Sequence, residues 1–127
     1  MLIAPLVVAV VVGLLVGCGH SRFQLGWVES NQPDHFRASY ATFSGSEIRA
    51  VRVGVGQTLR LEYNIEVDKG AVTLRVEDPD GRALWHTTLS EDTQDAVELG
   101  MDEAGRCAII IRGDGAGGSF DLSWEVQ

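Results

Sequence analysis

The side chains that could carry out covalent chemistry are scattered along this sequence and form no recognisable catalytic set. The three histidines, His20, His35 and His86, lie far apart, and the sequence contains neither an HExxH pair nor a closely spaced Cys/His set. A zinc site needs three or four such ligands brought together. Ser46 and Ser119 each follow a glycine but lack the GxSxG pattern of a nucleophile elbow. The sequence therefore predicts no catalytic residue, no metal site and no cofactor.

Four residues could contact a ligand without catalysing a reaction. Asp78, Asp80 and Asp114 lie in turn-like stretches, and loop carboxylates are ligands that Ca²⁺ accepts. Trp85 follows one of these turns and could stack on a sugar or meet a peptide. Each has an ordinary alternative, because Asp-Pro-Asp-Gly is a common turn sequence and a strand tryptophan often packs on its own sheet.

The overall charge narrows the choice of partner. Ten Lys and Arg residues face eighteen Asp and Glu residues, which gives a net charge of −8 over 127 residues. Nucleic-acid binding needs clustered cations, and the basic residues do not cluster along the sequence, so no nucleic-acid partner is expected. The same argument disfavours adhesion to anionic lipid through charge alone.

An apolar run at the start of the chain ends in a cysteine. Residues 1–19 carry no charged side chain, and the run closes with Leu15, Val16, Gly17 and Cys18. This ending resembles the bacterial lipobox. The resemblance implies that residues 1–17 are a cleaved signal peptide, that the Cys18 thiol carries a diacylglycerol, and that membrane lipid is its partner.

The leader leaves two other interpretations open. Export signals normally begin with Lys or Arg, and none precedes Cys18. The run has about the 20 apolar residues that span a bilayer, so it could be an uncleaved transmembrane helix, or else an ordinary buried helix. A lipid anchor instead places the domain at the cell membrane, facing the periplasm or the cell exterior. Two acyl chains hold a protein there without a basic patch.

Residues 18–34 are predicted to be a tether. They have no clean periodicity and are rich in Gly, Ser, Asn and Gln. Phe23, Leu25 and Trp27 alternate, so a short strand docked on the domain is an alternative.

Residues 35–127 are predicted to form one domain of β-strands, because their apolar residues recur with a period of two. Strands are expected at 36–43, 48–53, 59–67, 72–76, 82–89, 94–99, 106–112 and 120–126. Cys107 is expected to point inward as a small hydrophobe, and Trp124 to lie in the core. Gly- and Asp-rich turns at 54–56, 68–70, 78–81 and 113–118 separate these strands. The fold class is therefore all-β, an antiparallel, jelly-roll-like β-sandwich of about eight strands after an apolar leader.

Four sequence pieces resemble the small β-sandwich domains of bacterial secreted proteins, of the pre-peptidase C-terminal type. They are Val53-Gly54-x-Gly56-Gln57-x-Leu59, Val76-Glu77-Asp78-Pro79-Asp80-Gly81, Gly105-x-Cys107-x-Ile109-x-Ile111-x-Gly113 and Gly118-Ser119-Phe120-Asp121-Leu122-Ser123-Trp124. Cys107 stands where such domains often have Tyr. The resemblance implies a non-catalytic accessory or binding domain.

The leading functional hypothesis is a membrane-anchored lipoprotein that presents a binding or interaction module to an envelope protein or a glycan. One alternative is a purely structural envelope protein without a discrete ligand. A Ca²⁺-binding or carbohydrate-binding module is a further alternative. An extended groove or apolar patch on the surface would favour binding over a purely structural role.

Overall fold

Strands account for most of the residues that the structure, a computed structural model, describes, namely 23–127. The strands are β1 (Phe23–Leu25), β2 (Val28–Gln32), β3 (His35–Val53), β4 (Thr58–Glu77), β5 (Ala83–Leu89), β6 (Thr93–Gly100) and β7 (Gly105–Val126). Every pairing among them is antiparallel. The expected all-β, antiparallel sandwich is confirmed. The leader and Cys18 lie outside the described residues.

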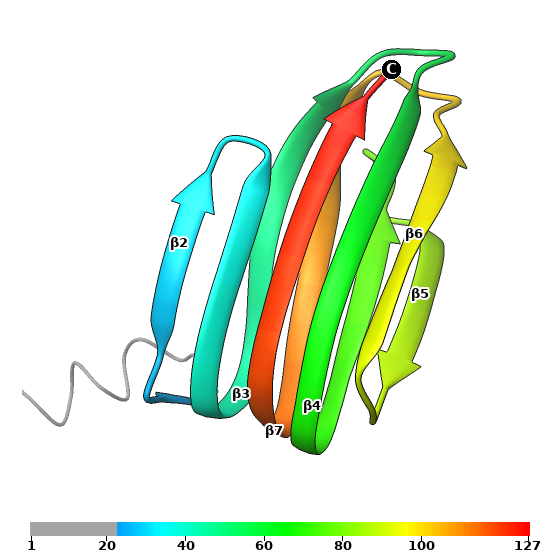
Figure 1. The fold of residues 1–127 in the computed structure, drawn as a ribbon. Coiled ribbons are helices and arrows are strands. Elements are labelled where there is room, and N and C mark those ends of the chain that lie inside the picture. Colours follow the sequence, from blue (N-terminus) through cyan, green and yellow to red (C-terminus); the bar gives the residue numbers. More distant parts are fainter. Residues whose placement is uncertain (1–22) are drawn as a thin grey trace, which may run out of the picture.

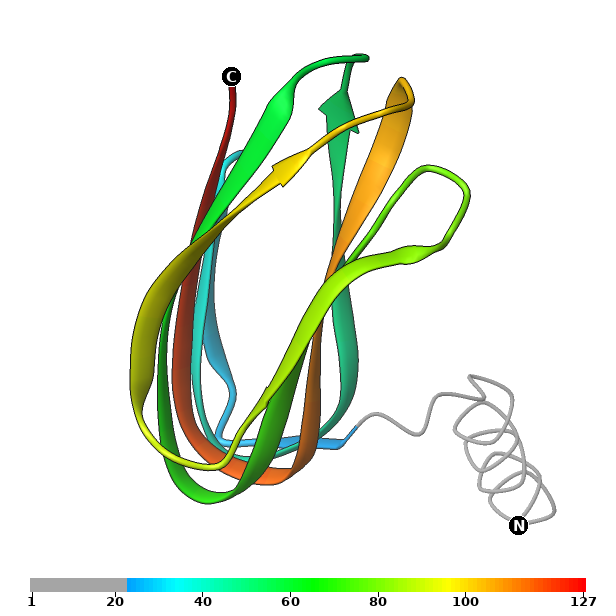
Figure 2. The same cartoon turned by 90° about the vertical axis from the view of Figure 1, so that its right-hand side faces the viewer.

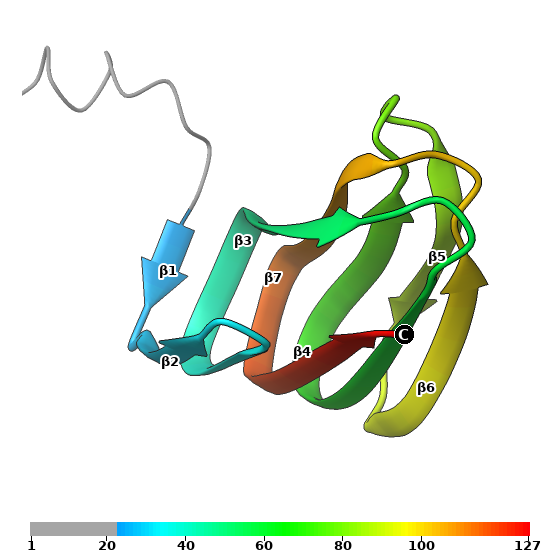
Figure 3. The ribbon, with the colours of Figure 1, turned by 90° about the horizontal axis from the view of Figure 1, so that it is seen from above.

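Three long strands, β3, β4 and β7, bend and run through both layers of the sandwich (Figures 1 and 2). The front layer contains β2, the first half of β3, the second half of β7, the first half of β4, and β6. The back layer contains the second half of β3, the first half of β7, the second half of β4, and β5. Seen from above, β1 lies at one edge beside β3 (Figure 3).

Glycines allow the strands to bend where the layers meet, at residues 40–45, 67–71 and 113–118, which we call the bend end. Gly70 has φ of 68° and Gly118 has φ of 136°, values that side-chain-bearing residues rarely adopt. A Cβ at Gly70 would also strike the backbone of Gly115. The expected turns at 68–70 and 113–118 are therefore bends within β4 and β7, and the strands expected at 36–43 and 48–53 are one strand.

The core lies between the layers and follows the predicted alternation. Cys107 is fully buried and Trp124 is 8% exposed, which confirms both inward placements. The largest fully buried side chains are Phe36, Phe43, Phe120, Leu59, Leu61, Ile65, Leu74, Ile109, Ile111, Leu122, Val72 and Val76. Such burial is the main source of stability for a domain of this size.

Two side chains close the edge of the sandwich next to β1 and β2. The Trp27 ring stacks on Tyr40 at 5.5 Å between centroids and meets the edge of Phe43 at 5.1 Å. The Arg49 guanidinium lies 3.7 Å from the centre of the Phe36 ring, and its Nη2 is 3.7 Å from Glu29 of β2. Both β1 and β2 fall within the residues expected as a tether, and they extend the sheet ahead of His35.

Candidate functional site

The outer side of the front layer, which we call the front face, gathers polar side chains from five neighbouring strand segments. Because alternate residues point to opposite sides of a strand, the residues between the core positions all reach this face. They include Ser30, Arg37, Ser39, Glu62, Asn64, Glu66, Gln94, Ser119, Asp121 and Ser123. No Phe, Tyr or Trp occupies an outward position in the strands of this layer.

Two adjoining hollows lie on the front face and share Asn64 and Asp121 in their walls. The first has a volume of about 420 Å³ and reaches Gln94 of β6 and Ser123 of β7. The second has a volume of about 450 Å³ and extends across β3 towards Val28 of β2. Both volumes fall in the range of small-molecule sites. Together they make a shallow polar surface that runs across the layer from β6 to β2.

Several hydrogen-bonding groups in these hollows are uncommitted. The Asn64 and Gln94 amides, the Arg37 guanidinium and the Ser123 hydroxyl make no side-chain hydrogen bond or ion pair with any other described residue. An amide offers two donors and an acceptor oxygen, and a guanidinium offers five donors. These groups can therefore bind hydroxyl-bearing ligands without first breaking an internal contact.

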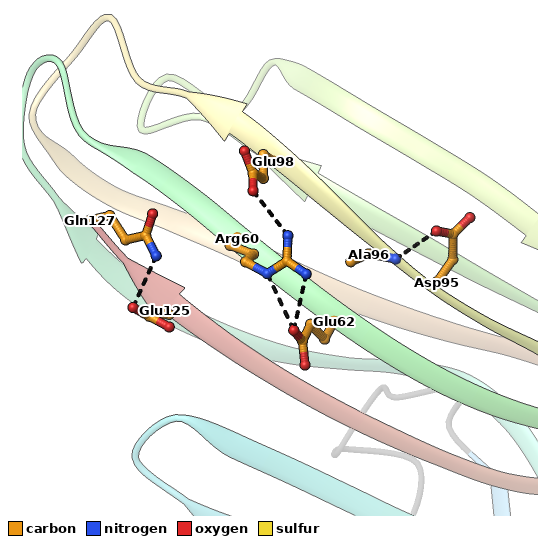
Figure 4. Close-up of polar contacts among 7 residues, drawn as sticks. All are labelled: Arg60, Glu62, Asp95, Ala96, Glu98, Glu125 and Gln127. Carbon is orange, nitrogen blue, oxygen red and sulfur yellow. Dashed lines mark hydrogen bonds and ion pairs between the residues drawn. The ribbon is translucent and has the colours of Figure 1, made fainter.

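Other polar groups of the front face are held in place. Arg60 of β4 donates to Glu98 of β6 at 2.9 Å and to Glu62 at 3.1 and 3.2 Å (Figure 4). Hydrogen bonds to Glu62 and Glu98 raise the pKa of Arg60. His35 Nε2 and Asp121 form a close contact between β3 and β7. These contacts hold Glu62 and Asp121, which line the first hollow, in fixed positions beside the uncommitted groups.

The acidic turn between β4 and β5 is built by its own carboxylates. Asp78 accepts hydrogen bonds from the backbone N–H groups of Asp80 and Arg82, both at 2.9 Å. Arg82 also lies 3.6 Å from Glu103, whose pKa is raised by its hydrogen bond to Asp80 and by partial burial. Asp78 thus serves as a turn-forming residue here.

The three aspartates proposed as ligand contacts do not form one site. Asp114 pairs with Ala71 at the bend end, whereas Asp78 follows Glu77, which pairs with Ala108. Six residues of β7 separate these register positions, a distance of about 20 Å. Within residues 23–127 no group of three His, Cys, Asp or Glu side chains is placed to hold a metal ion.

Trp85 is half-buried and faces the space between the layers. Its ring centroid is 5.7 Å from that of Tyr63, which comes from the front layer. Trp27 and Trp124 also pack on the core. None of the three tryptophans therefore supplies a flat platform on the front face.

Cys107 is a buried free thiol. Its Sγ lies 3.4 Å from the Met101 sulfur. Burial, with a smaller contribution from the Asp78 carboxylate, raises the pKa of Cys107, so the reactive thiolate is disfavoured.

The residues of the two hollows were not singled out from the sequence. The alternation does place Asn64 and Asp121 on a water-facing side. It does not reveal that Asn64 lies opposite both Gln94 and Asp121, because strand register depends on contacts far apart in the chain.

Comparison by sequence finds no relative: no protein-family model matches the chain, and no curated protein matches it significantly. We also find no helix within residues 23–127 with the length and hydrophobicity needed to cross a membrane.

Solved structures match the chain in fold. A CBM61 carbohydrate-binding module in complex with β-1,4-galactotriose has a TM-score of 0.54 at 14% identity, covering 80% of this chain and 89% of that one. The pre-peptidase C-terminal domain of a Bacillus anthracis collagenase has a TM-score of 0.51 at 11% identity, covering 76% and 100%. A CBM4 structure has a TM-score of 0.50 at 9% identity, covering 81% and 78%.

These neighbours establish the fold, and the pre-peptidase resemblance seen in the sequence is confirmed at that level. Similarity of fold alone does not transfer a ligand.

Proposed function

We propose that this domain is a non-catalytic binding module that takes a neutral glycan on its front face, and that it is held outside the cytoplasm by lipid on Cys18. The observation that carries the proposal is the pair of adjoining hollows on one sheet face, lined by uncommitted amide, guanidinium and hydroxyl groups. Sugar hydroxyls both donate and accept hydrogen bonds. The amides and the hydroxyl of the hollows can do both as well, and the guanidinium supplies further donors. The CBM61 module in complex with β-1,4-galactotriose is an example of a glycan held by a domain of similar fold, and it makes this sugar a suitable first ligand to try.

The charges of the front face favour an uncharged sugar. The residues that line the two hollows include one cation, Arg37, and five carboxylates, namely Glu29, Glu62, Glu66, Asp95 and Asp121. These carboxylates accept hydrogen bonds from sugar hydroxyls but repel uronic acids and sulfated sugars. Without an aromatic platform, binding rests on hydrogen bonds of about 1 kcal/mol each, so we expect dissociation constants near the millimolar range.

Isothermal titration with neutral oligosaccharides, β-1,4-galactotriose first among them, tests the glycan proposal. We expect saturable binding by the full-length protein, weakened about fivefold to tenfold by Asn64→Ala and by Ser123→Ala, as each removes about one hydrogen bond. Ser46→Ala, an exposed serine of the back layer, is the matched control and should leave affinity unchanged. If no oligosaccharide of the panel binds, or if Ser46→Ala weakens binding as much, the assignment is wrong.

Mass spectrometry of the membrane-extracted protein tests the anchor. We expect a mature chain that begins at Cys18 and carries acyl mass, as the Leu15-Val16-Gly17-Cys18 ending implies. Cys18→Ala should release the protein from the membrane or leave it unprocessed. Unchanged membrane retention of Cys18→Ala would instead support an uncleaved apolar helix.

A further inference from the structure

Three arginines that stand far apart in the sequence lie on the same surface of the folded domain. Arg52 and Arg106 are direct partners across β3 and β7, and Arg112 lies on the same side of β7, six positions or about 20 Å further along the strand. All three are exposed, and none makes a hydrogen bond or ion pair with another described residue. They lie on the outer side of the back layer, which we call the back face. The spacing of these arginines in the sequence does not reveal that they share one face, because strand register brings them to the same side of the sheet.

Apolar side chains lie among these arginines. Ile48 is 56% exposed and pairs with Ile110, and Ala50 pairs with Ala108, so both pairs fill the space between Arg112 and the Arg52–Arg106 pair. Arg75, the fourth arginine of this face, is held by Glu77 at 2.8 Å. Asp114 adds one carboxylate where the back face meets the bend end. The back face is thus apolar at its centre and positively charged around it, in contrast to the front face.

The chain enters the domain beside this face. β1 begins on the back-layer side of the bend end (Figure 2). Phe23 and Leu25 of β1 are 54% and 55% exposed. Because Gln24 pairs with the buried Phe43, these two side chains point away from the core. Two large apolar side chains therefore stand in solvent at the point nearest to the proposed anchor.

The distance from the anchor limits where the domain can lie. Phe23 is five positions after Cys18, and five residues span at most about 17 Å when fully extended. A domain held by lipid on Cys18 therefore stays within reach of the headgroup layer. An acidic domain held this close to anionic phospholipid must turn its positive side towards the surface.

We propose that the back face, with Phe23 and Leu25, is a docking surface for the anionic phospholipid headgroups of the membrane that holds the anchor. This inference rests on the proposed lipid on Cys18. Phe23 and Leu25 enter the interfacial region, while Arg52, Arg106 and Arg112 pair with lipid phosphates. The front face and its two hollows then point away from the membrane, where a glycan can reach them.

The test compares two engineered thiols in the acylated full-length protein, reconstituted in vesicles of phosphatidylcholine with or without one quarter phosphatidylglycerol. Ala50→Cys lies on the back face, and its matched control, Gln32→Cys, lies on β2 at the edge of the front layer; both native residues are exposed. A membrane-impermeant maleimide reports access to each thiol. Acylation occupies Cys18 and burial protects Cys107.

Each arginine near an anionic surface contributes about fivefold to binding, so three contribute roughly a hundredfold. We therefore expect phosphatidylglycerol to slow labelling of Ala50→Cys by tenfold or more and to leave Gln32→Cys unchanged. The triple variant R52E/R106E/R112E should abolish the slowing, whereas R37E on the front face should not.

Equal labelling of Ala50→Cys on both kinds of vesicle, in protein whose mass shows the acyl group, would overturn the docking surface and leave the anchor standing. An unmodified Cys18 by mass would remove the anchor and the docking geometry with it. Protection of Ala50→Cys by soluble DNA or polyphosphate to the same extent would assign the back face to general anion binding and also overturn the proposal.

Discussion

Two glycines at the bend end allow the cost of bending a strand to be separated from the cost of crowding. Gly118 has φ of 136°, and a Cβ there would overlap the carbonyl oxygen of Glu66. Gly115 has φ of 58°, but a Cβ there would have no neighbour within 4 Å. Replacing each with alanine therefore adds the same methyl group to a positive-φ position, with a clash in one case and open space in the other.

The expected losses differ by a clear margin. Gly115→Ala should cost about 1–2 kcal/mol for the left-handed backbone. Gly118→Ala should cost about 1–3 kcal/mol in backbone strain and about 1–3 kcal/mol more in overpacking. Each alanine also restricts the unfolded chain by a similar amount, so this gain cancels between the two variants. The difference of about 2.5 kcal/mol corresponds to a Tm lower by roughly 10–20 °C for a domain of about 100 residues.

Urea unfolding followed by tryptophan fluorescence measures both variants. The denaturant slope should match that of the parent protein, so that a shift in the midpoint reports stability alone. Equal stability of Gly115→Ala and Gly118→Ala, at equal slopes, would contradict the argument that close approach of β4 and β7 requires glycine at residue 118.

Four further outcomes follow from the core. Trp124→Ala should lower the free energy of unfolding by about 3–5 kcal/mol, measured by urea titration, because its ring is buried. Burial, together with the charge of Asp68, raises the pKa of Tyr40 to about 12, so stability should fall as pH rises from 10 to 12, by up to about 3 kcal/mol; Tyr40→Phe should remove most of this fall. At neutral pH Tyr40→Phe should not destabilise the protein, because the Tyr40 hydroxyl is buried without a hydrogen-bond partner among the described residues. A decrease of more than about 1 kcal/mol in the free energy of unfolding would show that the hydroxyl does have a hydrogen-bond partner. Cys107 should react with a maleimide only as fast as the protein unfolds, and rapid native-state labelling would show that the core is open there.

The sequence predicted the core better than the surface. Period-two alternation identified the inward residues from Leu59 to Ile65 and from Phe120 to Trp124, because burial on one side of a strand acts on each residue locally. Glycine-rich stretches were interpreted as turns, but at Gly70 and Gly118 the same backbone freedom bends a continuous strand. Local composition does not distinguish these two uses of glycine.

The front face and the back face both depend on which residues pair across neighbouring strands. This register cannot be predicted from short stretches of sequence. Asn64 meets Asp121 across 57 positions of sequence, and Arg52 meets Arg106 across 54. Side-chain type and position near a turn are the only features that mark Trp85 and Asp78 in the sequence as ligand contacts. Each has a local structural use, Trp85 in packing on Tyr63 and Asp78 in closing its turn.

The passage of β3, β4 and β7 through both layers has a consequence for how the domain folds. In most sandwiches one sheet could in principle assemble before the other, but here each central strand must find partners in both halves. Its pairings join distant parts of the chain, which slows folding into the millisecond-to-second range. Neither layer can unfold and leave the other intact, so the domain should unfold in a single cooperative transition. Partly unfolded states that are cleaved by proteases or that aggregate should therefore be rare.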